Sequence, residues 1–110
     1  RYGQHPRRMS KRLELIEKVI AAGSKDPFHH YARAMELRAL ARTEEALEAF
    51  DGVARDFPSY VPTYLMSAQI ALELGDLARA RRQADAGIVC ARAAGDDHAV
   101  SELEALRARA

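Results

Sequence analysis

Histidine and cysteine side chains would be the first candidates for chemistry in this chain, but their spacing gives little support for catalysis. His29 and His30 are adjacent, so on a helix they point about 100° apart. Neither has a second histidine four residues away, the spacing that lets one helical face hold zinc. Asp96, Asp97 and His98 could bind a metal or supply a base, but acids before a helix also act as caps. We therefore expect no metal site and no cofactor.

Cys90 is the only cysteine, so it cannot form an intrachain disulfide or a CxxC pair. It lies among Ile88, Val89 and Ala91, and no oriented base is evident beside it, which favours a buried thiol over a nucleophile. We expect no enzymatic activity. A single thiol also weakly favours the reducing cytoplasm.

Composition and charge indicate one folded domain without an obvious affinity for nucleic acid or membranes. The 110 residues are 48% apolar and 30% charged, and 17 basic residues nearly cancel 16 acidic ones. No segment approaches the ~18 apolar residues of a membrane span. Residues 1–9 are rich in arginine and are expected to form a disordered basic arm, although such an arm could also contact an acidic partner.

Apolar residues recur at intervals of three and four along most of the chain, which predicts an all-helical protein. Asp26 and Pro27 mark one helix start, and Thr43, followed by two glutamates, marks another. Ser59 is the expected cap of the next helix. Gly75 is expected to take a left-handed conformation, followed by a helix over residues 77–93. Every connection is short, so consecutive helices should pack antiparallel.

The sequence also repeats at an offset of 34 residues. This offset aligns Ala34 with Ala68 and Ala46 with Ala80. Upstream, it aligns the helix at residues 10–22 with the helix that follows Thr43. An up-down bundle would give no reason for such an offset.

The repeat resembles the tetratricopeptide repeat, whose pattern is W-x2-L-G-x2-Y, then A-x3-F, then P. Ala46, Phe50 and Pro58 fit the Ala, Phe and Pro positions at the right spacing. Departures from the pattern also occur, and they are Arg33, Ser67, Ala84 and Arg92.

The resemblance implies an all-α, right-handed α-solenoid of antiparallel helix pairs. It implies one domain over residues 10–110, with repeats at about 27–60 and 61–94 and half-repeat helices at 10–22 and 96–109. The residues expected to pack the repeats together are Ala34, Leu37, Ala46, Phe50, Pro58, Tyr64, Ala68 and Ala80.

In this family the first helices of successive repeats line a concave groove that binds a peptide or helix. The positions carried over are Phe28, Tyr31, Met35, Arg38, Leu65, Gln69, Leu72 and Glu73, with Ala99, Leu103 and Arg107 following in the last helix. The Lys and Asn positions of the family's carboxylate-binding members hold Tyr31, Met35 and Met66, so that type of clamp is not expected.

The resemblance therefore predicts a noncatalytic, cytoplasmic, bacterial adaptor that binds a protein partner and neither nucleic acid nor membrane. The alternative is a self-associating structural module, a homodimer whose groove is covered by a second copy. The sequence does not identify the partner.

Overall fold

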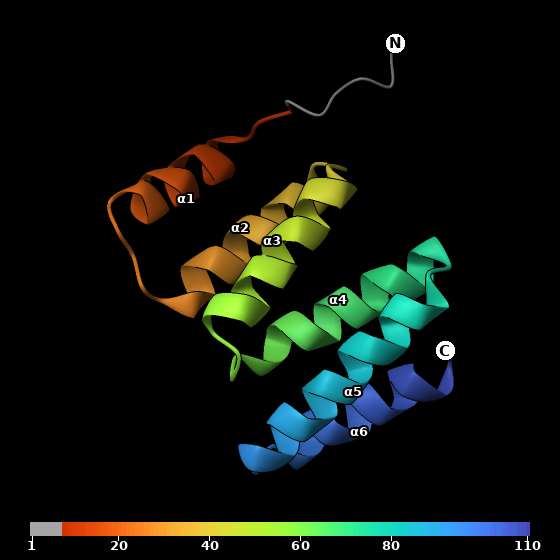
Figure 1. Cartoon of the computed structure of the whole chain (residues 1–110). Coiled ribbons are helices and arrows are strands. Elements are labelled where there is room, and N and C mark those ends of the chain that lie inside the picture. The colour runs from red at the N-terminus through yellow and green to blue at the C-terminus, as the bar shows by residue number, and fades with distance from the viewer. Residues whose placement is uncertain (1–7) are drawn as a thin grey trace. The chain divides into compact units, whose positions relative to one another are not determined.

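The computed structural model describes residues 8–110, which contain six α-helices and no strand (Figure 1). The all-helical prediction is therefore confirmed. The helices are α1 (Lys11–Ala21), α2 (Pro27–Ala39), α3 (Thr43–Asp56), α4 (Val61–Leu74), α5 (Leu77–Ala93) and α6 (Asp97–Ala108).

Most helix starts follow from local side-chain chemistry. The N-cap residues of α1, α2, α5 and α6 each accept a hydrogen bond from a backbone N–H of the first turn, and they are Ser10, Asp26, Asp76 and Asp96. The prediction that Ser59 caps α4 is wrong. The N-cap residue of α4 is Tyr60, whose side chain makes no capping bond. The turn extends to Tyr60 because its N–H donates to the carbonyl of Phe57 at 3.0 Å, so the helix begins later than the serine suggests.

Two tight turns use left-handed backbone conformations. Gly75 ends α4 with a φ of 78°, which confirms the sequence-based prediction. Ala41, between α2 and α3, has a φ of 61° although it carries a Cβ atom. A left-handed alanine costs roughly 1–2 kcal/mol, so the packing around this turn must offset that cost.

By their contacts the residues form two compact units, 1–52 and 53–110, which are described separately. In the first unit α1 packs against α2, and Leu13 and Leu37 are fully buried. The aromatic ring of Tyr31 on α2 lies 5.8 Å from that of Phe50 on α3, in a tilted arrangement.

Arg42, only 9% exposed, ties together the two ends of the described part of the first unit. Its Nε and Nη2 atoms donate to the two carboxylate oxygens of Glu45 at 2.9 and 2.8 Å. Its Nη1 donates to the carbonyl of Arg8 at 2.6 Å. Arg8 and Met9 are the only residues of the predicted basic arm that the structure describes; residues 1–7 lie outside the described part of the chain.

In the second unit α5 packs against both α4 and α6, and a buried cluster joins the three helices. Its members are Val61, Tyr64, Ala91, Ala99 and Leu103. Gly87 of α5 marks the closest approach: a Cβ atom at this position would lie 2.7 Å from Cβ of Tyr64 on α4 and 2.9 Å from a methyl carbon of Leu103 on α6. The absence of a side chain at residue 87 therefore allows α5 to lie between its two neighbours.

Seven of the eight residues expected to pack the repeats are buried. Pro58 is exposed, and its contribution is made by its backbone carbonyl, which accepts a hydrogen bond from the Tyr64 hydroxyl at 2.7 Å. None of the helices in residues 8–110 has the length and apolar content needed to cross a membrane.

Candidate functional site

The exposed face of α2 combines apolar and polar side chains. Phe28 is 56% exposed, and Tyr31, Met35 and Arg38 are half-buried. Their spacing of three, four and three residues places all four on one side of the helix. Ala34 and Leu37, which lie between them in the sequence, are fully buried. One side of α2 thus belongs to the core, and the other presents the residues carried over from the family.

The corresponding residues of α4, in the second unit, have a similar pattern. Leu65 and Leu72 are half-buried, and Gln69 and Glu73 are exposed. The amide of Gln69 donates to a carboxylate oxygen of Glu73 over a long 3.5 Å. Leu65 also packs against the buried cluster of its unit, so this face is apolar near the N-terminal half and polar farther along.

In α6 the equivalent positions do not form an open surface. Ala99 and Leu103, expected to continue the groove, are 4% and 0% exposed because both pack into the cluster with Tyr64. Arg107 is directed to Asp85 of α5, to whose carboxylate its Nε donates at 2.9 Å. The last helix therefore closes the core of its unit, and the expectation for Ala99 and Leu103 is wrong.

Sequence reasoning did not anticipate an open cavity of about 620 Å³ on the second unit. Its lining is mostly apolar and comes from the turn before α4 and one side of α5, including Pro58, Tyr64, Val89 and Cys90. The Cys90 thiol and the Tyr64 hydroxyl both donate to the Pro58 carbonyl, at 3.4 and 2.7 Å. The only sequence signal was the exposed valine beside the cysteine.

The Cys90 thiol has little nucleophilic character in this setting. Burial raises the pKa of Cys90 above its usual 9.0, which keeps the thiol protonated at neutral pH. Burial likewise raises the pKa of Tyr64 above 10.0, with a smaller contribution from Cys90. The two groups hold the turn before α4 through one shared carbonyl, a structural role.

Ser24, His29 and Asp26 lie together where α1 leads into α2, an arrangement that invites comparison with a hydrolase triad. Ser24 Oγ is 2.7 Å from His29 Nδ1, but His29 Nε2 is 4.0 Å from Asp26 Oδ2, which is beyond hydrogen-bond distance. Asp26 Oδ1 accepts from the backbone N–H of Phe28 at 2.9 Å. His30 Nε2 lies 2.9 Å from the carbonyl of Ser24. The cluster therefore fixes the turn and the start of α2.

The acids before α6 have a similar explanation. Asp96 caps the helix by accepting from the N–H of Ala99 at 3.0 Å, and His98 lies 3.3 Å from a carboxylate oxygen of Glu102 at the surface. Within residues 8–110, no three His, Cys, Asp or Glu side chains are grouped so that they could hold a metal ion.

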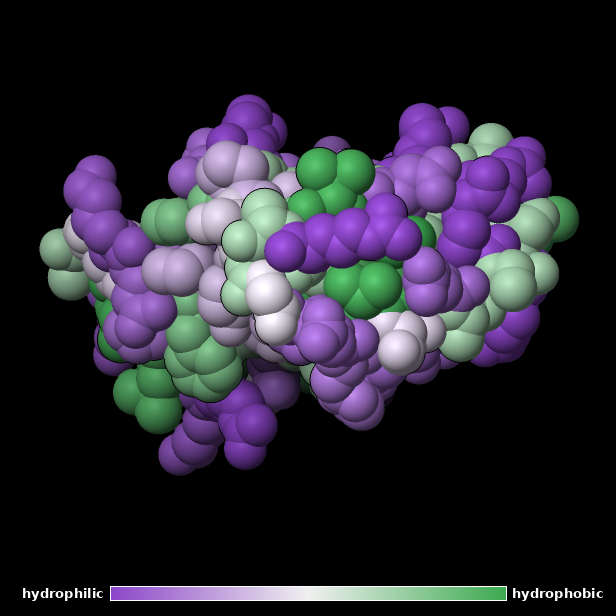
Figure 2. Space-filling model, turned by 90° about the horizontal axis from the view of Figure 1, so that it is seen from below, coloured by the Kyte–Doolittle hydropathy of each residue, from purple (hydrophilic) through white to green (hydrophobic). Residues whose placement is uncertain are grey.

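Exposed apolar residues are scattered over several helices. On the face shown in Figure 2, hydrophobic groups form small patches separated by hydrophilic side chains. The most exposed large apolar side chains are Val89 (70%), Leu15 (63%), Leu74 (58%) and Phe28 (56%).

Two solved structures of a tetratricopeptide repeat domain protein from Salinibacter ruber are similar to this chain. The crystal structure is 30% identical, with a TM-score of 0.72, and the match covers 76% of this chain and 94% of that one. The solution NMR structure is 29% identical, with a TM-score of 0.73, and the match covers 77% and 86% of the two chains.

A protein from Bordetella parapertussis, solved in solution, has the same fold with a TM-score of 0.76. It is 22% identical, over 92% of this chain and 88% of that chain. No protein-family model matches the sequence, and none of the curated proteins does.

Proposed function

The chain belongs to the tetratricopeptide repeat family, and we propose that it is a noncatalytic adaptor that binds a peptide or helix of a partner protein. The observation that carries this proposal is the division of both first helices into a buried and a surface side. In α2 and again in α4, the small or apolar residues of the repeat pattern are buried, while the carried-over positions remain at the surface.

The chemistry of these positions suits a peptide ligand. Tyr31, Met35 and Leu65 are half-buried apolar side chains, so they would be held in place yet offer contact area to a ligand. Gln69 and Glu73 are exposed and could bond to backbone or basic groups of the ligand. An amphipathic helix or an extended segment fits this combination.

A noncatalytic role agrees with the nature of the reactive groups that the structure describes. The raised pKa of Cys90 disfavours a thiolate, and the histidine nearest to a serine serves the turn before α2. We further propose that the protein acts in the bacterial cytoplasm, because one cysteine without a disulfide partner suits a reducing compartment and the similar solved structures come from bacteria.

The test is selection of ligands from a displayed library of random peptides, followed by affinity measurement on variants of the full chain. Phe28→Ala on α2 and Glu73→Lys on α4 change exposed side chains, so the fold should survive. We expect both variants to weaken the selected peptides by at least about fivefold, the scale of losing roughly 1 kcal/mol at an interface. The control Val89→Ala changes an exposed residue of α5 and should leave affinity unchanged.

Peptides that bind all variants equally would contradict the proposed sites on α2 and α4. Light scattering at micromolar concentration tests the homodimer alternative: we expect a monomer, whereas a dimer that Phe28→Ala or Glu73→Lys dissociates would show that a second copy occupies these faces.

A further inference from the structure

The first helix has an apolar face that the described part of the chain leaves open. Leu15 is 63% exposed and Val19 is 42% exposed, although each is four residues from the next apolar or small residue along the same side. On the opposite side of α1, Leu13 is fully buried. α1 is therefore apolar on two sides, and only one of them is covered.

The repeat register shows what covers the equivalent face elsewhere. An offset of 34 residues relates Val19 to Val53 of α3 and then to Gly87 of α5. Val53 is 2% exposed, and a Cβ atom at Gly87 would touch Tyr64 of α4 on one side and Leu103 of α6 on the other. α5 thus has a first helix packed on each of two sides. In residues 8–110 no helix precedes α1, so one of these two sides of α1 has no counterpart of α4.

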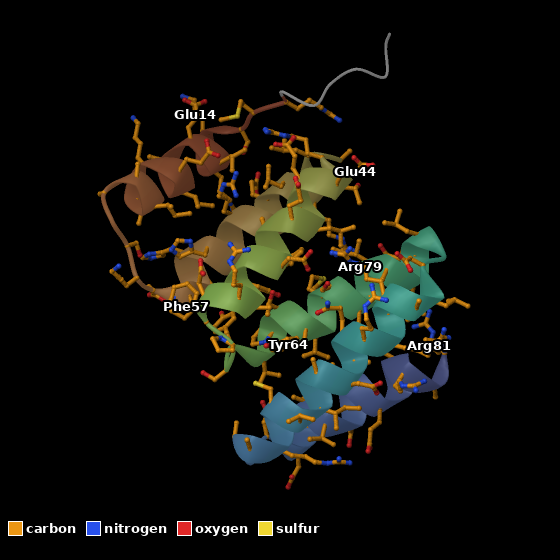
Figure 3. All side chains as sticks on the ribbon, viewed as in Figure 1. Glu14, Glu44, Phe57, Tyr64, Arg79 and Arg81 are labelled. Carbon is orange, nitrogen blue, oxygen red and sulfur yellow. The ribbon has the colours of Figure 1, made fainter. Side chains whose placement is uncertain are left out.

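Basic side chains frame this open face. On a helical wheel Lys11 and Lys18 flank Leu15 on one side, and Arg12 lies beside Val19 on the other. All three are exposed. Glu14 lies farther round the helix and points away from α2 (Figure 3).

Arg12 occupies a position that a close-packed neutral helix could not cover. The same register aligns it with Ala46 and Ala80, which are 0% and 1% exposed where helices approach closely. A helix laid over Arg12 would remove its guanidinium from water, which is costly unless a carboxylate is placed opposite. The chemistry of the occupant is thereby specified: apolar toward Leu15 and Val19, acidic toward the three basic residues.

We propose that the face of α1 formed by Leu15 and Val19 and framed by Lys11, Arg12 and Lys18 binds an amphipathic helix of another protein that carries acidic residues beside its apolar stripe. This helix would lie against α1 as α4 lies against α5. The surface differs from the proposed peptide sites on α2 and α4, and the adaptor would have two interaction surfaces.

A second copy of the chain is a poor occupant. Its own α1 carries the same basic residues, so two such faces repel each other. Its α6 has exposed acids, but the apolar residues Ala99 and Leu103 are already buried within that copy. The charge and the apolar stripe that this face requires do not occur together on the open side of either terminal helix.

The experiment uses a fluorescein-labelled 18-residue helical peptide with leucine at each i, i+3, i+4 and i+7 position and glutamate at the flanking positions, and a matched peptide with lysine in place of glutamate. Fluorescence anisotropy is measured with the full chain. The glutamate peptide should bind about tenfold or more tightly than the lysine peptide, and its affinity should fall as salt rises.

Variants locate the binding. Leu15→Asp should abolish binding of the glutamate peptide, and Lys11→Glu combined with Lys18→Glu should reverse the preference between the two peptides. Both changes are at exposed positions, and helicity measured by circular dichroism verifies that each variant is folded. Val89→Asp on α5 and Glu73→Lys on α4 serve as controls that leave binding unchanged.

Three outcomes would overturn the proposal. The first is no binding of the glutamate peptide at low salt, and the second is binding that Glu73→Lys abolishes and Leu15→Asp does not. The third is a dimer of the unliganded chain, seen by light scattering, that Leu15→Asp dissociates. The second outcome would leave the adaptor function on α4 intact, so failure of this surface and failure of the proposed function are distinguishable.

Discussion

We expect Gly87→Ala to destabilise the protein by about 1 kcal/mol, although alanine is the better helix former. Gly87 lies in the interior of α5, where alanine alone would stabilise a helix by roughly 1 kcal/mol. The new Cβ atom, however, would lie 2.7 Å from Cβ of Tyr64. Ordinary contacts begin at 3.4 Å, so α4 and α5 must separate by about 0.7 Å (3.4 − 2.7).

The two neighbours of this Cβ atom differ in their freedom to move. The Leu103 methyl groups, at 2.9 and 3.1 Å, can rotate away. Cβ of Tyr64 is bonded directly to the α4 backbone, so relief requires movement of a helix. Overpacking of this kind costs about 1–3 kcal/mol, which exceeds the gain in helix propensity at its midpoint.

The assay is thermal and chemical denaturation of three proteins: wild type, Gly87→Ala and Ala86→Gly. Ala86 is the preceding residue and is exposed, so Ala86→Gly measures the propensity difference on α5 without a steric effect. We expect the Tm of Gly87→Ala to fall by about 4–8 °C. If Gly87→Ala instead raises the Tm by as much as Ala86→Gly lowers it, the close approach of α4 and α5 is refuted.

Three further predictions concern buried side chains. Arg42→Ala should lower the free energy of unfolding by about 1–3 kcal/mol, and Arg42→Lys should restore only part of it, because lysine cannot donate in parallel to both oxygens of Glu45; urea denaturation measures both. Tyr64→Phe should cost about 1 kcal/mol at pH 7 by removing the bond to the Pro58 carbonyl. Because burial raises the pKa of Tyr64, its neutral hydroxyl stabilises the fold below pH 10.0, and this is lost as pH rises through the folded-state pKa. Urea titrations between pH 9 and 11, in a Cys90→Ala background, should therefore show wild-type Tyr64 losing stability that Tyr64→Phe does not. Ala46→Phe should cost about 1–3 kcal/mol, and an unchanged thermal melt would contradict close helix packing at this fully buried position.

The helix boundaries could be predicted because they depend on short-range chemistry. Asp76 and Asp96 accept bonds from N–H groups three residues away, and Gly75 takes its φ of 78° without any partner helix. Ser59 failed as a cap because the preceding proline sets the turn and Tyr60 bonds back to Phe57. Competition between neighbouring turn signals was not visible in the order of residues alone.

Exposure of the site residues depends on which helix covers which, and the sequence pattern does not contain that information. Ala99 and Leu103 occupy positions equivalent to the surface side of α4, yet both are buried. Close approaches are equally hidden. Nothing in the sequence near Gly87 indicates that Tyr64, 23 residues earlier, would lie against it.

The two ends of the repeat array treat solvent differently, and this difference argues for a partner at α1. The register that relates Ala34 to Ala68 continues to Glu102, which is exposed on α6, and it relates Tyr64 to the exposed His98. α6 thus replaces buried residues with polar ones, as a terminal helix that faces water should. α1 keeps Leu15 and Val19 exposed on its uncovered side instead. A helix that ended the array against water would gain nothing from these two side chains, so their retention beside a ring of basic residues is better explained by a ligand that covers them.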